Sequence, residues 1–183
     1  VAFDHTSVSP DIMTVSKALT GGYMPMSITI VTQDIYDAFY ADYGEYKAFM
    51  HSHTYAGNPL GCAAALAVLD IMKEDHVLDT AAETATYLHE QLNAALGNHP
   101  HVGEIRHIGL INAIELVKDR ETKDAFDSKQ RTGYQIYKAA LDRGLLLRPL
   151  GDVLYFNPAL TIDKETLDTA IAKTVEAIGA VIG

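Results

Sequence analysis

Cysteine, basic residues and long apolar runs are all scarce in this sequence, and each shortage excludes a class of protein. Cys62 is the only cysteine, so no disulfide can form within the chain, and we expect a reducing, cytoplasmic location. Lysine and arginine total 14 against 24 aspartate and glutamate residues, a formal net charge of −10. Nucleic acid and anionic membranes are therefore not expected partners, because both bind clustered cations. No uninterrupted apolar run reaches the roughly 18 residues that indicate a membrane-spanning helix.

Four common catalytic signatures are absent as well. The sequence has no GxxxxGK[ST] phosphate loop, no GxGxxG dinucleotide motif, no GxSxG nucleophile elbow and no HExxH zinc motif. The chain begins VAFDHTSVSP, with no initiator methionine and no charged-then-apolar leader. We therefore expect a fragment of a longer protein.

The first part of the chain is predicted to contain two strands, a short helix, a loop and a long helix. The expected bounds are 11–16 and 26–32 for the strands, 33–41 for the short helix and 42–58 for the loop. The long helix is expected to start at Asn58-Pro59, because asparagine is a favoured N-cap and proline a favoured first helical residue. Its sequence GCAAALAVLDIM is apolar nearly all round, so we expect it to be buried.

Near residue 75 the pattern changes, and an amphipathic helix from Leu78 to Ala95 is predicted to stop at Gly97. Strands and helices then alternate, which predicts an α/β fold. The expected strands are one around Ile105, 110–117, 145–149 and 153–156, and the expected helices are 130–143 and a last one capped by Asp163. We expect two domains, residues 1–75 and residues 76–183.

Lys17 stands between a short, partly β-branched run and the glycine pair Gly21-Gly22, in the stretch PDIMTVSKALTGGYMP. A lysine amine becomes nucleophilic when burial or a nearby cation favours its neutral form. The end of a buried strand meets that condition, so Lys17 is a candidate for forming a Schiff base with a carbonyl compound. The alternative is an ordinary surface lysine with a packed stem and a solvated ammonium.

The stretch HSHTYAGNP, residues 51–59, is a small polar loop that leads directly into a helix start. Amide N–H groups at a helix N-terminus together with the Thr54 hydroxyl suit a phosphate. Metal binding by His51 and His53 is a second interpretation, although an HxH pair lacks a third ligand. A plain capping loop without a ligand is the third.

Arg148 follows three leucines in LLLRPLGDVLYF. A guanidinium that leaves an apolar strand is expected to meet a carboxylate or phosphate, because an unpaired buried charge is costly. The partner is either an anionic ligand or an acidic side chain of the same protein.

Taken together, the stretches SPDIMTVSKALTGGYMP, HTYAGNPLGCAAALAVL and RPLGDVLYFNPAL resemble the class III aminotransferases, pyridoxal-phosphate enzymes of fold type I. The resemblance covers the whole chain. It implies that residues 1–75 are the C-terminal part of the large cofactor-binding domain. It also implies that residues 76–183 are the small C-terminal α/β domain.

The resemblance implies a role for each candidate residue in the first half. Lys17 would hold pyridoxal 5′-phosphate covalently and, once released, move the proton of the substrate carbon. Thr54, with the backbone at His53, would bind the cofactor phosphate. Ser52 stands where the family often has a glycine that contacts substrate. Because this loop reaches the other subunit's site in the family, a homodimer with shared active sites is expected.

In the second half, the resemblance implies that Arg148 binds a substrate carboxylate and that Tyr155 lines the same pocket. No residue is expected to bind a metal. The expected reactants are small molecules, an amine donor and a keto acceptor.

Phe49-Met50-His51 and the RPLGDVLYFNPAL stretch resemble the biotin-synthesis branch of the family, which implies amino transfer from adenosylmethionine or lysine to an amino-keto acid. Ser52 replaces a glycine that is frequent in the family, and His53 stands where some members of that branch have proline. Another class III ω-amino acid or amine aminotransferase is therefore the alternative. The family's acidic partner of the cofactor ring would lie upstream of Val1. We therefore expect residues 1–183 alone not to transaminate, and a folded but inactive fragment is the non-enzymatic alternative.

Overall fold

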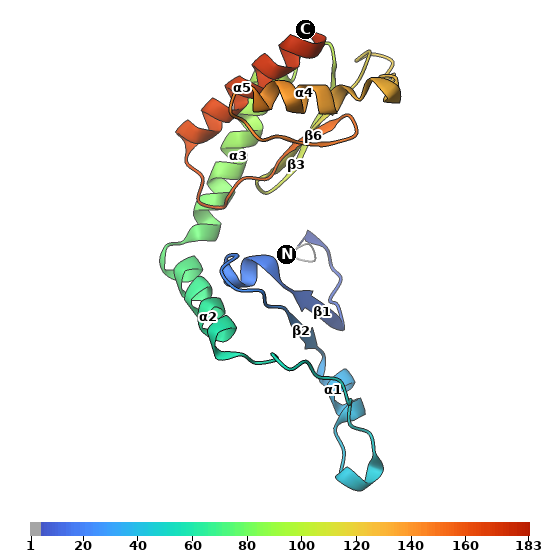
Figure 1. Cartoon of the computed structure of the whole chain (residues 1–183), viewed down its shortest axis with the longest axis vertical. Coiled ribbons are helices and arrows are strands. Elements are labelled where there is room, and N and C mark those ends of the chain that lie inside the picture. The colour runs from blue at the N-terminus through green and yellow to red at the C-terminus, as the bar shows by residue number, and fades with distance from the viewer. Residues whose placement is uncertain (1–4) are drawn as a thin grey trace. The chain divides into compact units, whose positions relative to one another are not determined.

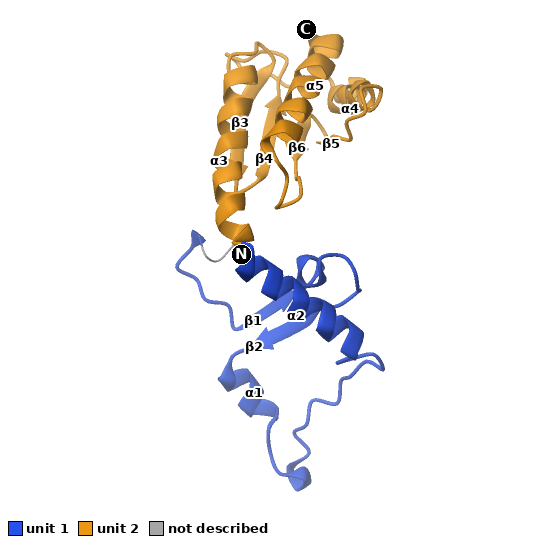
Figure 2. Cartoon of the chain, turned by 90° about the vertical axis from the view of Figure 1, so that its left-hand side faces the viewer, with its two compact units in different colours: residues 1–75 blue, residues 76–183 orange. Residues whose placement is uncertain are grey.

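The computed structural model describes residues 5–183, and the chain divides into two compact units, residues 1–75 and residues 76–183 (Figure 2). Figures 1 and 2 together label the helices and strands of each unit. Within the part of the chain that is described, no helix has both the length and the apolar character needed to cross a membrane.

The first unit is built on a two-stranded antiparallel sheet. Strand β1 (Ile12–Val15) pairs with strand β2 (Ile28–Val31). The other elements are the 3₁₀ helix η2 (Lys17–Thr20), helix α1 (Gln33–Phe39), the 3₁₀ helix η3 (Tyr43–Glu45) and helix α2 (Pro59–Glu74). The two strands and the helix start at Pro59 lie where the sequence predicted them.

Helix α2 starts as expected but is not buried as expected. The Asn58 side chain accepts a hydrogen bond from the Gly61 amide at 2.8 Å, and Pro59 is the first helical residue. Within the helix only Gly61 and Ala65 are buried, whereas Leu69 is 52% exposed. The prediction of a buried helix is therefore wrong for this chain. A two-stranded sheet offers too little apolar surface to cover every side of a 16-residue helix.

The second unit is a four-stranded antiparallel sheet with helices packed against it (Figure 2). The strand order is β3-β4-β6-β5. The strands are β3 (Val102–Ile108), β4 (Ile111–Leu116), β5 (Arg148–Leu150) and β6 (Val153–Phe156). The helices are α3 (Val77–Leu96), α4 (Thr132–Leu141) and α5 (Lys164–Ile182), and the 3₁₀ helix η4 (Ser128–Gln130) precedes α4.

The strand predicted at 145–149 begins only at Arg148. The preceding residues close the end of α4 instead. The Leu145 amide donates to the Ala140 carbonyl at 2.9 Å, and Gly144 has the left-handed φ of 72° that favours glycine at a helix end. The Leu145 amide is therefore used to close the helix end and is not available for a hydrogen bond in the sheet.

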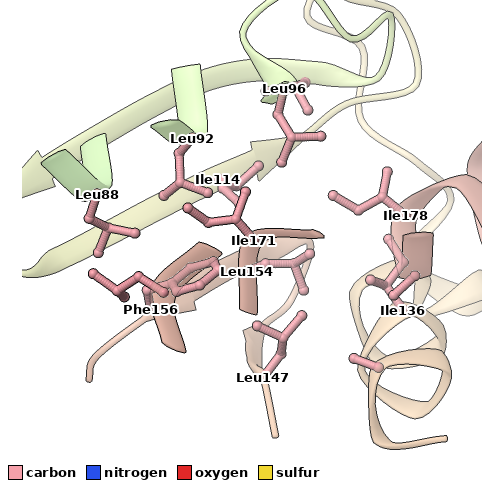
Figure 3. Packing of buried hydrophobic residues seen from close by; sticks show 14 of the residues in the cluster. Leu88, Leu92, Leu96, Ile114, Ile136, Leu147, Leu154, Phe156, Ile171 and Ile178 are labelled. Atoms are coloured by element: carbon pink, nitrogen blue, oxygen red, sulfur yellow. The ribbon is translucent and has the colours of Figure 1, made fainter. Parts of the chain in front are cut away.

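The core of the second unit lies between its helices and one face of its sheet (Figure 3). Helix α3 contributes leucines spaced four residues apart, so they share one face of the helix. The fully buried side chains labelled in Figure 3 include Leu88, Leu92, Leu96, Ile114, Ile136, Leu154 and Ile178. Strand β4 alternates, with Ile114 buried and Ala113 half-buried. The sheet therefore has one covered face and one open face, and the open face bears Tyr155 and Arg148.

Candidate active site

Lys17 starts η2 immediately after β1, and its backbone lies in the left-handed region at φ 53°. For a residue with a side chain this conformation costs on the order of 1–2 kcal/mol. It persists only where the surroundings enforce it, and such residues concentrate at functional sites. Tyr46, His76, Lys123 and Arg131 also have a left-handed φ, so this conformation does not by itself single out Lys17.

The turn after Lys17 is held by its own hydrogen bonds. The Leu19 amide donates to the Ser16 carbonyl at 3.2 Å, and the buried Thr20 hydroxyl donates to the Met24 carbonyl at 2.5 Å. Gly21 has φ 57°, a conformation that glycine adopts without cost.

Helix α2 packs against this turn. A Cβ atom added at Gly21 would lie 3.2 Å from Cγ2 of Val68, which is tighter than an ordinary contact. The backbone four residues after Lys17 therefore rests directly on the middle of α2. Glycine is needed at this position both for its φ and for its lack of a side chain.

The expectation that Lys17 ends a buried strand is wrong. The residues of β1 alternate between exposed and half-buried, and the Lys17 side chain is itself exposed. The cause is the same as for α2, since the two-stranded sheet cannot enclose its own ends. Among the residues that the structure describes, no hydrogen bond or ion pair engages the Lys17 amine. The amine is therefore accessible to an added carbonyl compound.

The Thr54 loop forms a turn just before α2. The Ala56 amide donates to the His53 carbonyl at 3.0 Å, and Gly57 has φ 69°. The side chains of Ser52, His53 and Thr54 are exposed. Within residues 5–183 the Thr54 hydroxyl has no hydrogen-bond partner, so it can bind an oxyanion.

The start of α2 contributes less to an anion site than the sequence suggested. The amide of Gly61 is already capped by Asn58, and the amide of Cys62 donates to the Asn58 carbonyl at 3.1 Å. Pro59 has no amide proton. The Thr54 hydroxyl and the loop backbone are therefore the groups that could bind a phosphate here.

The rings of His51 and His53 pack edge to face with centroids 5.0 Å apart. Across the described range, no group of three or more histidine, cysteine or acidic side chains could hold a metal ion. The metal-binding interpretation of this loop thus gains no support from the fold.

Arg148 and Tyr155 are brought together by the sheet. They are direct partners in the register of β5 and β6, and the guanidinium carbon lies 5.5 Å from the centre of the tyrosine ring. Arg148 is exposed, so the premise of a buried charge is wrong. No acidic side chain of the described chain pairs with it, which excludes the internal salt bridge in this structure.

The sequence motifs did not single out a second arginine, at the opposite edge of the same sheet. Arg106 of β3 lies on the same open face as Arg148 and is paired with Glu115 and Glu104. The hydrogen bond that Arg106 donates to Glu115 raises the pKa of Arg106 above its ordinary value. Alternation along β3 could have placed Arg106 on a face, but the sequence does not reveal which strands lie beside it.

The predicted residues fall into two sets, one in each unit. Lys17, Ser52, His53 and Thr54 belong to the first unit, and Arg148 and Tyr155 to the second.

Comparison with known proteins identifies the family. The sequence profile described as aminotransferase class-III matches residues 1–178. An adenosylmethionine-8-amino-7-oxononanoate aminotransferase of Anoxybacillus flavithermus is 46% identical over 177 residues, covering 97% of this chain and 39% of that protein. A diaminobutyrate–2-oxoglutarate transaminase of Halomonas elongata is 38% identical over 179 residues, covering 97% of this chain and 38% of that protein.

A solved structure gives the same answer. The adenosylmethionine-8-amino-7-oxononanoate aminotransferase of Methanocaldococcus jannaschii matches with a TM-score of 0.88 and 36% identity. The match covers 96% of this chain and 40% of that one, so this chain spans about 40% of the length of such relatives. The mixed helix-and-sheet fold expected from the sequence is confirmed, and so is the family resemblance. The chain belongs to the class III aminotransferases.

Proposed function

We propose that a protein carrying this chain at the length of its relatives is a pyridoxal-phosphate-dependent aminotransferase. Family membership over residues 1–178 supports the reaction class. The observation that carries the proposal is Lys17, whose exposed amine stands on a backbone in the left-handed region. Left-handed non-glycine residues concentrate at functional sites, but Lys123 has a left-handed φ as well, so the backbone supports this role only together with the family membership.

The residues present fit the cofactor. An accessible amine suits its aldehyde, and a free hydroxyl beside exposed loop backbone suits its phosphate. Lys17 would therefore hold the aldehyde end, and Thr54 with the backbone at His53 the phosphate end. When bound, pyridoxal 5′-phosphate supplies the electron sink that stabilises negative charge on the substrate carbon.

Lys17 also has a role as a base. Its Nζ atom, once free of the cofactor, would act as the general base that takes the proton from the substrate carbon. The same atom, now protonated, would then act as the general acid that gives the proton back and completes the amino transfer. The hydrogen bonds made by the Ser16 carbonyl, the Thr20 hydroxyl and the Gly21 amide hold the backbone of the turn in place while the Lys17 side chain moves. A rigid turn with a mobile four-carbon side chain suits a group that must visit two positions.

We propose that Arg148 binds the carboxylate of the substrate. Its guanidinium is exposed and has no acidic partner within the described residues, so its N–H edge is available for a bidentate contact. Tyr155, which pairs with Arg148 on the neighbouring strand, is proposed to line the same substrate pocket. Ser52 is also proposed to contact the substrate.

The proposed reaction moves an amino group from adenosylmethionine or lysine to 8-amino-7-oxononanoate, giving 7,8-diaminononanoate for biotin synthesis. The names of several relatives support this choice, as do the FMH and RPLGDVLYF details of the sequence. The alternative is another class III reaction, favoured by the similar diaminobutyrate–2-oxoglutarate transaminase. A donor screen separates the two, because only the first accepts adenosylmethionine or lysine with the amino-keto acid. The proposed assembly is a cytoplasmic homodimer.

The role of Lys17 is tested by trapping. Chain 1–183 is mixed with pyridoxal 5′-phosphate, reduced with borohydride and mapped by mass spectrometry, with Lys17→Ala and Lys73→Ala as matched variants. Lys73 is a lysine of the same unit on an ordinary helical backbone. We expect one dominant adduct at Lys17, lost in Lys17→Ala and retained in Lys73→Ala. Adducts spread evenly over the lysines would contradict the proposal.

A further inference from the structure

Two arginines share one row across the open face of the second unit's sheet. The register pairs Arg106 with Ala113, Ala113 with Tyr155, and Tyr155 with Arg148. Directly opposed residues of antiparallel strands point to the same side, so all four side chains project from the face that the helices leave uncovered. Both arginines are exposed, and they differ in what they contact.

Arg106 is neutralised by its neighbours. Its Nη1 donates to Glu115 of β4 and, at 3.3 Å, to Glu104 of its own strand. Two carboxylates therefore compete with any ligand for its donor edge. An arginine held in this way has little to offer an incoming carboxylate.

Arg148 contacts an aromatic ring instead of an acid. Its guanidinium carbon lies 5.5 Å from the ring centre of Tyr155, within the range of a cation–π contact. A ring restrains the guanidinium without neutralising it and leaves its N–H donors unoccupied. Tyr155 is half-buried and belongs to β6, which is paired with β4 and β5 on its two sides.

We infer that Tyr155 is a positioning residue that acts through Arg148, holding the guanidinium over its ring so that the donor edge is presented to a substrate carboxylate. The inference rests on the proposed function, in which Arg148 binds that carboxylate. It gives Tyr155 a role through its ring face, so the phenol hydroxyl is not required. It also explains why Arg148, rather than Arg106 in the same row, is the arginine that receives the ligand.

The contact is tested by NMR on chain 1–183 without ligand. The Arg148 Nε–Hε and Cδ–Hδ signals are compared in wild type, Tyr155→Phe and Tyr155→Leu. We expect a ring-current shift in wild type and Tyr155→Phe that disappears in Tyr155→Leu. Arg106 is the internal control, and its signals stay in place because Glu115 and Glu104 hold it. Absence of the Arg148 shift in wild type, or its persistence in Tyr155→Leu, overturns the inference.

The same samples are then titrated with hexanoate, with hexylamine as the charge-reversed control. An exposed cation–π contact is worth about 0.5–1 kcal/mol, so Tyr155→Leu should bind hexanoate roughly two- to fivefold more weakly than wild type. Tyr155→Phe should match wild type, which separates ring from hydroxyl. Equal affinity in Tyr155→Leu and wild type overturns the inference. If the shifts follow the ring but hexanoate binds to no variant, the positioning is supported and the carboxylate role of Arg148 fails.

Discussion

The two units of this chain differ sharply in how they bury apolar surface. The second unit encloses a contiguous core, with side chains such as Leu92 at 0% exposure. The first unit leaves large apolar side chains exposed on α1 and α2 and on the segments between them, among them Leu66 at 62%. Yet the first unit carries the strained lysine turn and the Thr54 loop. Stability within this chain is therefore concentrated in one unit, and the proposed cofactor chemistry in the other.

The largest expected effect comes from separating the units. Residues 76–183 should unfold cooperatively on their own, because their core is complete without the first unit. Residues 1–75 should show no cooperative transition, because a two-stranded sheet is not stable without further packing. Urea denaturation followed by circular dichroism measures both. A cooperative transition in residues 1–75 would show that the first unit is stable without the second and would contradict this prediction.

Two leucine-to-alanine substitutions, one in each unit, test the same difference in burial. Leu92→Ala empties a site with no exposure and should lower the free energy of unfolding by about 2–5 kcal/mol. Leu69→Ala removes a side chain that is 52% exposed, and its expected cost is below about 1 kcal/mol. Both helices favour alanine, so propensity does not explain the difference. Similar losses in the two variants would show that α2 is buried in solution.

The smallest expected effect is a dependence on pH that belongs to the second unit. The rings of His89 and His107 stack with centroids 3.7 Å apart. Burial, and next the neighbouring His89, lower the pKa of His107 below its ordinary value of 6.5. The unfolded chain therefore binds the proton more readily than the folded chain. Stability rises with pH between the folded and unfolded pKa values and is lost as pH falls below about 6.5.

His107→Asn should flatten this slope. Denaturant midpoints measured from pH 5 to pH 8 provide the check. His99 also has a lowered pKa, mainly because of burial, so part of the slope remains in His107→Asn. An unchanged slope in that variant would exclude the His89–His107 stack as its source.

Much of the fold could be predicted from local signals. Asn58 and Asp163 were expected to cap helices, and each accepts a hydrogen bond from an amide of the first turn. The face predicted for α3 is buried at Ala81, Ala85, Leu88 and Leu92, whereas Leu78 at its start is 62% exposed. These features depend on residues three or four positions apart, which a sequence displays directly.

The remaining features depend on partners distant in sequence. The apolar pattern of α2 indicates a helix but not what covers it, and here most of that surface stays exposed. The pairing of Arg148 with Tyr155, and the row that ends at Arg106, follow from strand register rather than from any motif. The left-handed backbone of Lys17 begins a turn whose Gly21 lies against Val68 of α2, a residue some fifty positions away in the sequence. Roles for Ser52, His53, Thr54 and Tyr155 came from family resemblance and remain predictions.

The contact between Gly21 and Val68 links helix α2 to the turn that carries Lys17. A Cβ atom added at position 21 would lie 3.2 Å from Cγ2 of Val68, so side chains at positions 21 and 68 compete for the same space. A bulkier residue at position 68 is therefore expected to press on the backbone four residues after Lys17. The middle of a helix that carries none of the candidate site residues thus sets a steric limit on the turn that carries Lys17.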